Sequence, residues 1–397
     1  MQRHRIYDDV LVEHLRKYRQ MAFLTGPRQV GKTTLCRQRG VYLNWDDQDD
    51  RAAILAGPNE VARRTKLDQL SATTRVIAFD ELHKYGRWKA FLKGFFDTWE
   101  KQAHILVTGS SRMDVFRRGG DSLMGRYFLY RVHPFSVGEA GRAKLSLSLM
   151  QPARCPDEKD WQALWEHGGF PEPFLKRDPR FTRRWRQLRH QQLLREDVRD
   201  LTRLHELGQL ETLAVLLRER SGGPIVYSNL ARDIQVSVDT VRRWIELLAS
   251  LHVGFVVRPW YRNVAKSLRK EPKWYEADWA AVENEGARWE TLVACHLQKA
   301  VQLWQDLGLG DFELRYLRDK EKREIDFLVI RDNAPWFLVE AKSSDSSMPV
   351  NLDYFQRQIG APHAISVVRN LDYVQADALG SSRPTVVPGR TFLSQLP

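Results

Sequence analysis

The sequence predicts an α/β protein whose N-terminal part is a parallel sheet with helices on both faces. Short apolar runs alternate with helical patterns up to about residue 150, one run ends in a glycine-rich loop, and another ends in two acids. Such alternation favours a parallel sheet, because each crossover between parallel strands needs a connection long enough for a helix. The predicted elements are, as strands, Met21–Thr25, Val41–Asn44, Val76–Phe79 and His104–Thr108, and, as helices, Lys32–Arg39 and Lys89–Glu100.

The rest of the chain predicts regions of different character. After a break at Gln151–Pro156 the pattern is helical to about residue 255 and includes an arginine-rich stretch, Lys176–Arg203. A second basic stretch, Arg262–Lys273, predicts a loop or hairpin. From about Gly286 we expect one helix and then a region rich in strands. The expected elements of that region are strands Glu313–Leu317, Ile325–Ile330, Trp336–Glu340 and Ala364–Val368 and a helix near Asp353–Gln358.

Composition excludes several classes of protein. The 397 residues exceed what one ordinary core organises, and 43% hydrophobic with 28% charged residues is typical of a folded globular chain. No run approaches the roughly 18 apolar residues of a membrane helix. The N-terminus has charges where a secretory signal would need an apolar run, so we do not expect export. Because the three cysteines stand apart, we expect no disulfide framework and no structural zinc site, which fits a cytoplasmic location. Because no apolar run is long enough, we expect no membrane partner. The net charge of +12 favours a polyanionic partner.

The strongest motif is Gly26-Pro-Arg-Gln-Val-Gly-Lys-Thr-Thr34, which follows a predicted strand and precedes a predicted helix. In this pattern the glycines let backbone N–H groups point at phosphate oxygens, the lysine reaches the β and γ phosphates, and a hydroxyl binds Mg²⁺. We therefore predict that the cofactors are ATP and Mg²⁺, with Lys32 on the phosphates and Thr33 on the ion. The predicted ATP-binding residues are Gly26, Pro27, Arg28, Gln29, Val30, Gly31, Lys32, Thr33 and Thr34.

Two neighbouring strands supply the side chains expected for hydrolysis. The run Val76–Phe79 ends in Asp80 and Glu81, and ligands of a parallel sheet bind at the carboxyl ends of its strands. Asp80 is predicted to hold Mg²⁺, and Glu81 to polarise the attacking water as general base. Ser110 or Thr108, at the end of the next strand, is predicted to sense the γ-phosphate.

An arginine is expected to complete this site, because a positive side chain near the γ-phosphate stabilises the charge of the transition state. Arg126 is the leading candidate. The other candidates are Arg112, Arg117, Arg118 and Arg131. An arginine supplied by a neighbouring subunit would make the chain a homo-oligomer.

These motifs resemble those of a prokaryotic family of AAA-type P-loop ATPases whose C-terminal domain, formerly of unknown function, is related to PD-(D/E)XK nucleases. The matching segments are Gly26–Thr34, Phe79–Lys84, Leu106–Ser111, Leu123–Arg126, His133–Ser136 and Gly168–Glu172. The resemblance covers nearly the whole chain, and it also favours Arg126 as the arginine finger. It implies an AAA P-loop core at residues 1–150, a helical lid with basic helices at 151–215, a winged-helix module at 216–275 and a restriction-endonuclease-like α/β domain at 276–397.

A helix-turn-helix is predicted within the winged-helix range. Tyr227–Ser237 predicts a short helix and a turn, Val238–Leu248 the next helix, and Leu251–Val257 the first wing strand. In such a motif the second helix enters the major groove of DNA. The predicted DNA-binding residues, near the exposed start of that helix, are Thr240, Arg242 and Arg243. The alternative is a module used for packing or oligomerisation, and the basic stretch at 176–203 is either a contact with backbone phosphates or a solvated face.

A second acidic motif lies near the C-terminus. Asp326 opens one predicted strand, and Glu340-Ala-Lys342 closes the next, which places these side chains at one end of a small sheet. Two carboxylates can hold a divalent ion, and a lysine can activate water or steady a phosphate. The resemblance to PD-(D/E)XK enzymes adds Glu290, so Glu290, Asp326 and Glu340 are candidate ligands of a nuclease metal, with Lys342 as the nuclease lysine. The Glu-x-Lys pattern recurs at Glu271–Lys273, without an apolar strand before it.

The leading hypothesis is a Mg²⁺-dependent ATPase, converting ATP to ADP and phosphate, that binds and remodels nucleic acid. DNA is the expected nucleic acid, with branched DNA among its candidate forms. Two alternatives stay open: an ATP-dependent switch that assembles protein partners, and an ATP-regulated DNA nuclease. The switch predicts slow turnover that is indifferent to DNA, and the nuclease predicts metal-dependent cleavage that Lys342→Ala or Asp326→Ala abolishes.

Overall fold

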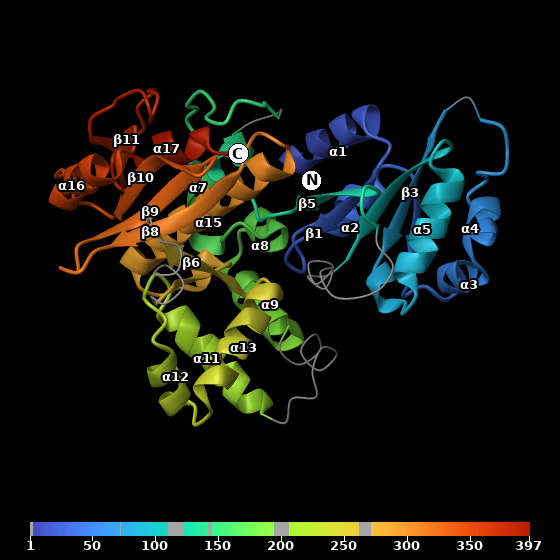
Figure 1. Ribbon diagram of the computed structural model, residues 1–397, viewed down its shortest axis with the longest axis horizontal. Coiled ribbons are helices and arrows are strands. Elements are labelled where there is room, and N and C mark those ends of the chain that lie inside the picture. Colours follow the sequence, from blue (N-terminus) through green and yellow to red (C-terminus); the bar gives the residue numbers. More distant parts are fainter. Residues whose placement is uncertain (1–2, 72, 110–122, 142–144, 194–205, 262–270) are drawn as a thin grey trace. The chain divides into compact units, whose positions relative to one another are not determined.

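The computed structural model describes the chain except residues 1–2, 72, 110–122, 142–144, 194–205 and 262–270. The chain divides into two compact units, Met1–His133 and Pro134–Pro397 (Figure 1). Within the described ranges, no helix combines the length and the apolar character that crossing a bilayer requires.

The first unit is built on a parallel sheet. Its described strands lie in the order β2-β3-β4-β1-β5, and each neighbouring pair is parallel. The strands are β1 (Met21–Thr25), β2 (Val41–Asn44), β3 (Arg75–Asp80), β4 (Ala103–Thr108) and β5 (Tyr127–Arg131). Because all strands point the same way, their carboxyl ends lie along one edge of the sheet.

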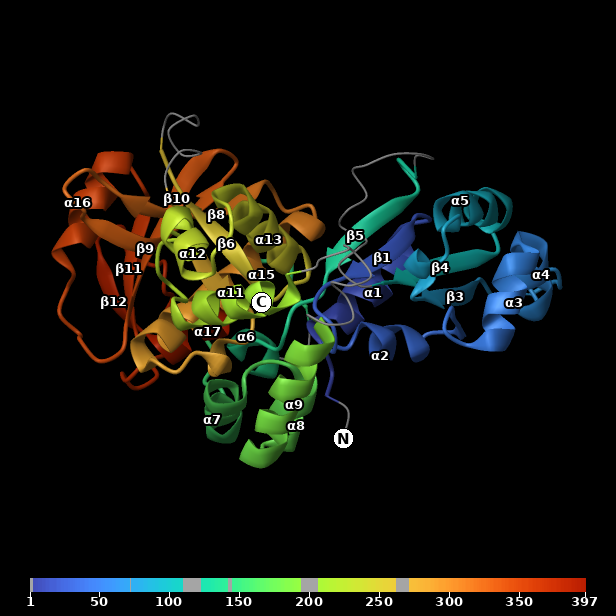
Figure 2. The same ribbon diagram turned by 90° about the horizontal axis from the view of Figure 1, so that it is seen from below.

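Helices cover both faces of this sheet, with α5 on one side of the strands and α1 and α2 on the other (Figure 2). Phe23 and Phe79 pack with Phe95 of α5 in one apolar cluster. Their neighbours Ala22 and Ala78 are equally buried and face the other way, since side chains alternate along a strand. The helices are α1 (Ile6–Lys17), α2 (Lys32–Arg37), α3 (Gln48–Ala56), α4 (Pro58–Arg64) and α5 (Trp88–Trp99), and a 3-10 turn η1 (Leu82–Lys84) follows β3.

The second unit begins with helices. They are α6 (Val137–Gly141), α7 (Glu158–His167), α8 (Pro171–Lys176), α9 (Pro179–Gln192), α11 (Leu207–Glu219), α12 (Tyr227–Asp233) and α13 (Val238–Ser250). The last three share one core, to which Leu213, Leu230 and Val241 contribute. The Ser237 hydroxyl accepts the backbone N–H of Thr240 at 3.1 Å and so caps α13, as serine commonly does.

A mixed sheet completes the second unit, with its described strands in the order β12-β11-β10-β9-β8-β6-β7. The strands are β6 (Gly254–Pro259), β7 (Lys273–Glu276), β8 (Phe312–Arg318), β9 (Glu324–Arg331), β10 (Ala334–Lys342), β11 (His363–Val368) and β12 (Thr385–Pro388). On one face Phe327 and Val339 pack against α15 (Glu285–Asp306). On the other face Leu328 and Leu338 pack against α16 (Val350–Ile359). The remaining short elements are η4 (Trp279–Ala281) and α17 (Gly389–Gln395).

Most of the predicted elements are confirmed. The first two predicted strands match β1 and β2 to the residue, and β3, β4, β8, β9, β10, β11 and α16 contain the spans expected for them. Helix α5 lies one residue before its expected span, and α15 is the helix expected from about Gly286. The basic stretch Arg262–Lys273, for which a loop or hairpin was expected, lies mostly outside the described residues. The strands before and after it, β6 and β7, pair antiparallel.

The C-terminal acids lie on a larger sheet than the small one expected. Arg258 and Pro259 of β6 pair with Arg315 and Tyr316 of β8, so the hairpin of the predicted winged-helix range continues the C-terminal sheet. This pairing crosses the predicted boundary between 275 and 276, and the compact units divide at 133/134. The four domain ranges therefore stay predictions.

Candidate functional site

The loop from Gly26 to Thr34 joins β1 to α2 at the carboxyl edge of the first sheet. Gly26 has a φ of 140°, and a Cβ there would lie 2.2 Å from the Val132 carbonyl oxygen, so only glycine fits. Gly31, with a φ of 100°, precedes α2, and Gln29 is left-handed with a φ of 64°. Such a turn aims successive backbone N–H groups into one concave space, which is the geometry that binds phosphate.

Lys32 lies inside this loop and is only 8% exposed. Its ammonium donates to the carbonyl oxygens of Gly26 and Pro27, each at 2.8 Å. The Arg5 guanidinium braces the same loop, because it donates to the Val30 carbonyl at 3.0 Å. The lysine is thus held where the β and γ phosphates of a nucleotide would meet it.

Asp80, at the carboxyl end of β3, is the acceptor of a buried network. Its carboxylate accepts the Thr33 hydroxyl at 2.9 Å, the Glu81 backbone N–H at 3.1 Å, and the hydroxyls of Tyr42 and Thr108. Thr33 and Asp80 come from opposite sides of β4, and they meet because β4 is the single strand between β1 and β3. A hydroxyl and a carboxylate are hard oxygen ligands, so the pair fits Mg²⁺.

Glu81 follows Asp80 in a left-handed conformation, with a φ of 55°. Its carboxylate lies 3.4 Å from the Lys84 ammonium and 3.7 Å from the His83 ring. Lys84 is also bound by Asp46 at 2.6 Å, and the Glu81 side chain is 27% exposed. Glu81 is therefore adjacent to the Asp80 network and partly open to solvent, as a group that orients water must be.

The candidate sensor and arginine-finger residues differ in their distance from the nucleotide loop, and several lie outside the described residues. Thr108 lies on Asp80, whereas Ser110 and the candidate arginines 112, 117 and 118 lie outside the described residues. Arg126 forms two hydrogen bonds with Asp97, at 2.8 and 2.9 Å. Its backbone carbonyl accepts the N–H of Met21 at the start of β1, so Arg126 lies at the sheet edge opposite the loop. Arg131, opposite Thr25 in the pairing of β5 with β1, lies at the loop edge.

The predicted DNA-binding residues lie together near the start of α13. Arg242 and Arg243 are exposed, and Thr240 is half-buried. The Arg242 guanidinium lies 4.3 Å from the centre of the Tyr227 ring, and Arg243 donates to the Thr240 hydroxyl at 3.3 Å. The buried face of α13 carries Val241, Ile245 and Leu248, as the sequence pattern predicts.

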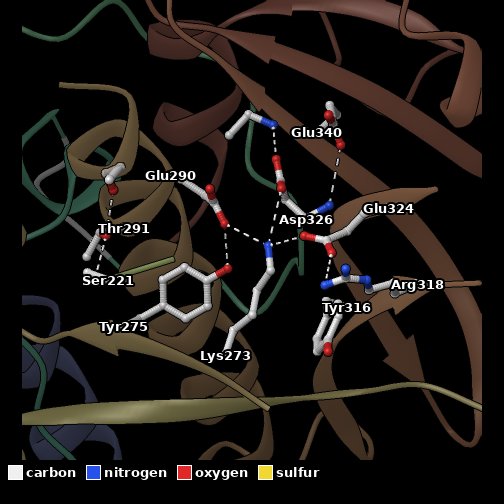
Figure 3. A network of polar contacts seen from close by, with 12 residues as sticks. Ser221, Lys273, Tyr275, Glu290, Thr291, Tyr316, Arg318, Glu324, Asp326 and Glu340 are labelled. Atoms are coloured by element: carbon white, nitrogen blue, oxygen red, sulfur yellow. Dashed lines mark hydrogen bonds and ion pairs between the residues drawn. The ribbon is translucent and has the colours of Figure 1, made fainter. Parts of the chain in front are cut away.

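The acids of the second motif lie close together, as predicted from the strand ends. The Asp326 backbone N–H donates to Glu340 at 3.4 Å, and the Ala341 N–H donates to Asp326 at 2.9 Å. Lys342 pairs with Glu340 at 2.8 Å. Glu290 reaches the same region from α15 (Figure 3). Among the described residues, however, no group of three or more His, Cys, Asp or Glu side chains is arranged to hold a metal ion.

A buried lysine that the motif analysis set aside lies among these acids. The Lys273 ammonium, on β7, is 2.7 Å from Glu324, 3.1 Å from Glu290 and 3.5 Å from Asp326 (Figure 3). The Tyr275 hydroxyl donates to Glu290 at 2.7 Å. The sequence did carry a signal for Lys273, the second Glu-x-Lys pattern. That pattern was given less weight because no apolar strand precedes it, but Lys273 is the first residue of its strand and not the last.

Burial and the neighbouring charges shift the protonation of this cluster. Burial and then the Asp326 carboxylate raise the pKa of Glu290 to about 7, and the same two causes raise the pKa of Glu340 to about 7. Burial by itself lowers the pKa of Lys273, but Tyr275 and the surrounding carboxylates outweigh it and hold that pKa well above its ordinary value. Lys273 is therefore a permanent cation at neutral pH.

Two other residues of the nucleotide site escaped the sequence analysis. Tyr42 lies on β2, beside β3, and its hydroxyl reaches Asp80. Arg5 precedes α1 and braces the loop from a distant point of the sequence. Neither belongs to a motif, so only the strand order and the packing of α1 bring them to the site.

Comparisons with known proteins match the chain in three stretches. Residues 18–141 match the family described as an AAA domain. Residues 158–283 and 285–381 match two domains of unknown function, DUF8612 and DUF4143.

Two relatives are the uncharacterized proteins Mb2031c of Mycobacterium bovis and Rv2008c of Mycobacterium tuberculosis. Each is 26% identical over 346 residues, which cover 82% of this chain and 71% of the relative. Among solved structures, PCH-2 of C. elegans aligns with a TM-score of 0.25 and 14% identity. That alignment covers 62% of this chain and 65% of the PCH-2 chain, which is less than two thirds of its length. The Hef helicase domain of Pyrococcus furiosus aligns with a TM-score of 0.20 and 11% identity, over 97% of this chain and 95% of that one.

Proposed function

We propose that this chain, whose residues 18–141 form an AAA-type P-loop ATPase domain, is a cytoplasmic Mg²⁺-dependent ATPase that remodels nucleic acid, with DNA as its substrate. The observation that supports hydrolysis is the meeting of Thr33 and Asp80 at 2.9 Å beside a loop that encloses Lys32. Binding ATP requires the loop alone, whereas splitting it requires the metal ligands and a group that orients water.

Each residue of the site has a role that follows from its place. The backbone N–H groups of the loop and the Lys32 ammonium bind the phosphates. Thr33 and Asp80 would hold Mg²⁺, which neutralises charge on the transferred phosphoryl group. Glu81 orients the attacking water and accepts its proton, and Thr108 fixes the orientation of the Asp80 carboxylate.

We also propose that the active form is a homo-oligomer. Arg126 lies at the sheet edge opposite its own loop, so it cannot reach a nucleotide bound to the same chain. A finger supplied by Arg126 would therefore act on the nucleotide of a neighbouring copy, after release from Asp97. Of the candidate arginines that the structure describes, Arg131, at the loop edge, is the one that would act within one chain.

The nucleic-acid part of the proposal is supported by exposed arginines in the second unit. Arg242 and Arg243 are exposed on α13, and Arg180, Arg183 and Arg184 are exposed on α9. Arginines that face solvent can bind backbone phosphates, and α13 with the β6–β7 hairpin matches the order of elements in a winged helix. We propose that this region grips DNA beside a nuclease-like C-terminal sheet.

ATP turnover with and without DNA tests the proposal. We expect turnover to rise when single-stranded, duplex or branched DNA is added, and to disappear in Lys32→Ala and Glu81→Gln. Lys17→Ala is the matched control, because Lys17 is an exposed lysine of the same unit paired with Glu13. Turnover that ignores every DNA would favour the switch that assembles protein partners, and an absence of nucleotide binding would end the ATPase proposal.

DNA binding by α13 has its own test. Arg242→Ala and Arg243→Ala should each weaken binding across sequences and lower the slope of log affinity against log salt by about 1. Arg63→Ala, at an exposed arginine of the first unit paired with Glu60, should leave the slope unchanged. Unchanged slopes in all three variants would remove α13 from the interface.

A further inference from the structure

Side chains from several elements of the second unit meet at the ammonium of Lys273. Glu290 comes from α15, Glu324 and Asp326 from β9, and Lys273 from β7, which follows the helices α11 to α13 along the chain. Lys273 is 3% exposed, and its ammonium has three carboxylates within 3.5 Å. The ammonium donates a hydrogen bond to Glu290 and forms ion pairs with Glu324 and Asp326 (Figure 3).

A divalent ion would need the same place. Mg²⁺ and Ca²⁺ bind carboxylate oxygens at about 2.0–2.6 Å, and they would have to lie between Glu290 and Asp326 to use both. Lys273 already lies between these two side chains, and two cations at such short separation repel strongly where the surroundings are apolar. The residues present therefore do not fit a metal ion while Lys273 is in place.

The second lysine of the region does not open a place for an ion either. Lys342 is bound to Glu340 at 2.8 Å, on the other side of Asp326. The remaining oxygens of Asp326 and Glu340 accept backbone N–H groups of β9 and β10. The acids that sequence reasoning assigned to a metal are thus partnered within the chain.

We propose that the ammonium of Lys273 is the resident cation of this acidic site, in place of a divalent ion, and that the C-terminal domain therefore does not cut DNA. Lys273 thus also joins β7, at one end of the mixed sheet, to α15 and to β9 of the same sheet. The inference concerns a site separate from the ATP loop, and it stands whether or not the chain hydrolyses ATP.

The test is a gain of metal binding when the lysine is removed. The parent is the full chain carrying Asp80→Asn, so that the nucleotide site does not report, and the probe is MnCl₂ followed by electron paramagnetic resonance without nucleotide. We expect no binding to the parent that depends on Asp326, and one Mn²⁺ per chain in the parent with Lys273→Ala, with an apparent affinity at least tenfold above the parent. Mn²⁺ should also raise the melting temperature of the Lys273→Ala protein.

Lys299→Ala is the matched control. Lys299 is another buried lysine, 2% exposed, and it pairs with Glu139 at 2.5 Å, away from the Asp326 site. Its removal should lower stability without creating a place for Mn²⁺. If Lys273→Ala is too unstable to purify, Lys273→Met keeps the aliphatic stem and replaces it.

Three results would overturn the proposal. One is Mn²⁺ binding to the parent that Asp326→Asn removes. Another is a folded Lys273→Ala or Lys273→Met protein that gains no Mn²⁺. The third is cleavage of linear or branched DNA by the wild-type chain with Mg²⁺ or Mn²⁺, abolished by Asp326→Ala. None of these depends on ATP turnover, so failure here and failure of the ATPase proposal are separate outcomes.

Discussion

The two acidic sites of this chain differ in what lies at their centres. Around Asp80, hydroxyls of Thr33, Tyr42 and Thr108 point at the carboxylate, and Lys32 binds carbonyl oxygens of its own loop. Around Asp326, the ammonium of Lys273 takes the central place. A carboxylate surrounded by neutral donors can accept a cation from solution, whereas one that already faces a buried lysine has a permanent partner. Counting acids in a motif does not separate these two cases.

The largest expected effect is on ATP turnover. Lys32→Ala removes the buried cation of the loop, and we expect turnover to fall by at least about a hundredfold, as when a preorganised donor to a transition state is lost. Steady-state phosphate release measures it. If Lys273→Ala lowered turnover equally in a folded protein, the two sites would not be functionally distinct.

For the free energy of unfolding we expect the larger loss at the second acidic site and the smaller loss at the nucleotide site. Lys273→Ala leaves buried carboxylates without their cation, and we expect the free energy of unfolding to fall by about 3–5 kcal/mol. Asp80→Asn keeps an acceptor for the surrounding hydroxyls and should cost about 1 kcal/mol. Denaturant unfolding followed by tryptophan fluorescence compares the two, and equal losses would contradict the distinction.

The crowded acids of the second site predict a pH dependence. Because the folded chain raises the pKa of Glu340 to about 7 from an ordinary value of 4.5, the folded state binds more protons than the unfolded state between these values. The stability that Glu340 contributes is therefore complete below pH 4.5 and is lost as the pH rises through 7. Relative to wild type, Glu340→Gln should gain up to about 1.4 kcal/mol per pH unit across this window.

Unfolding free energies at pH 5, 6, 7 and 8 measure that gain. Glu313→Gln, at an exposed glutamate of β8, is the control and should follow wild type at each pH. A constant difference between Glu340→Gln and wild type would show that burial and Asp326 do not raise the pKa of Glu340.

The smallest expected effect is on stability and comes from a substitution outside both sites. It gives a reference for the size of the other effects. Ser237→Ala removes the side-chain cap of α13, and we expect a loss of about 1 kcal/mol in the free energy of unfolding. ATP turnover without DNA should stay at the wild-type value, since the change is local to the helix. A larger loss would mean that α13 depends on its first turn more than its buried face implies.

The sequence predicts the first unit well because its signals are local. The loop at Gly26–Thr34 and the acids after β3 each follow a short apolar strand, and a parallel sheet brings such ends to one edge. Thr108 could be placed by the same reasoning, whereas Tyr42 and Arg5 could not. The contacts of Tyr42 and Arg5 depend on which strands are neighbours and on how α1 packs, and no local sequence motif predicts either property.

The second acidic site was only half predictable for a related reason. The strands that carry Asp326 and Glu340 are adjacent in sequence, so their proximity followed from a simple antiparallel connection. Lys273 reaches them from a hairpin that precedes α15, through a strand order that no local pattern encodes. The charge of a site assembled from distant segments cannot be summed before the fold is known.

The pairing of β6 with β8 has a practical consequence for anyone who wishes to divide this protein. A fragment starting at residue 276 would lack β6 and nearly all of β7. Strand β8 would then be an edge strand with unpaired backbone groups, which can pair with strands of other molecules. A fragment ending at 275 would keep β6 without β8, the strand it pairs with. We expect both fragments to be insoluble, so the second unit is best expressed, or exchanged between relatives, as a whole.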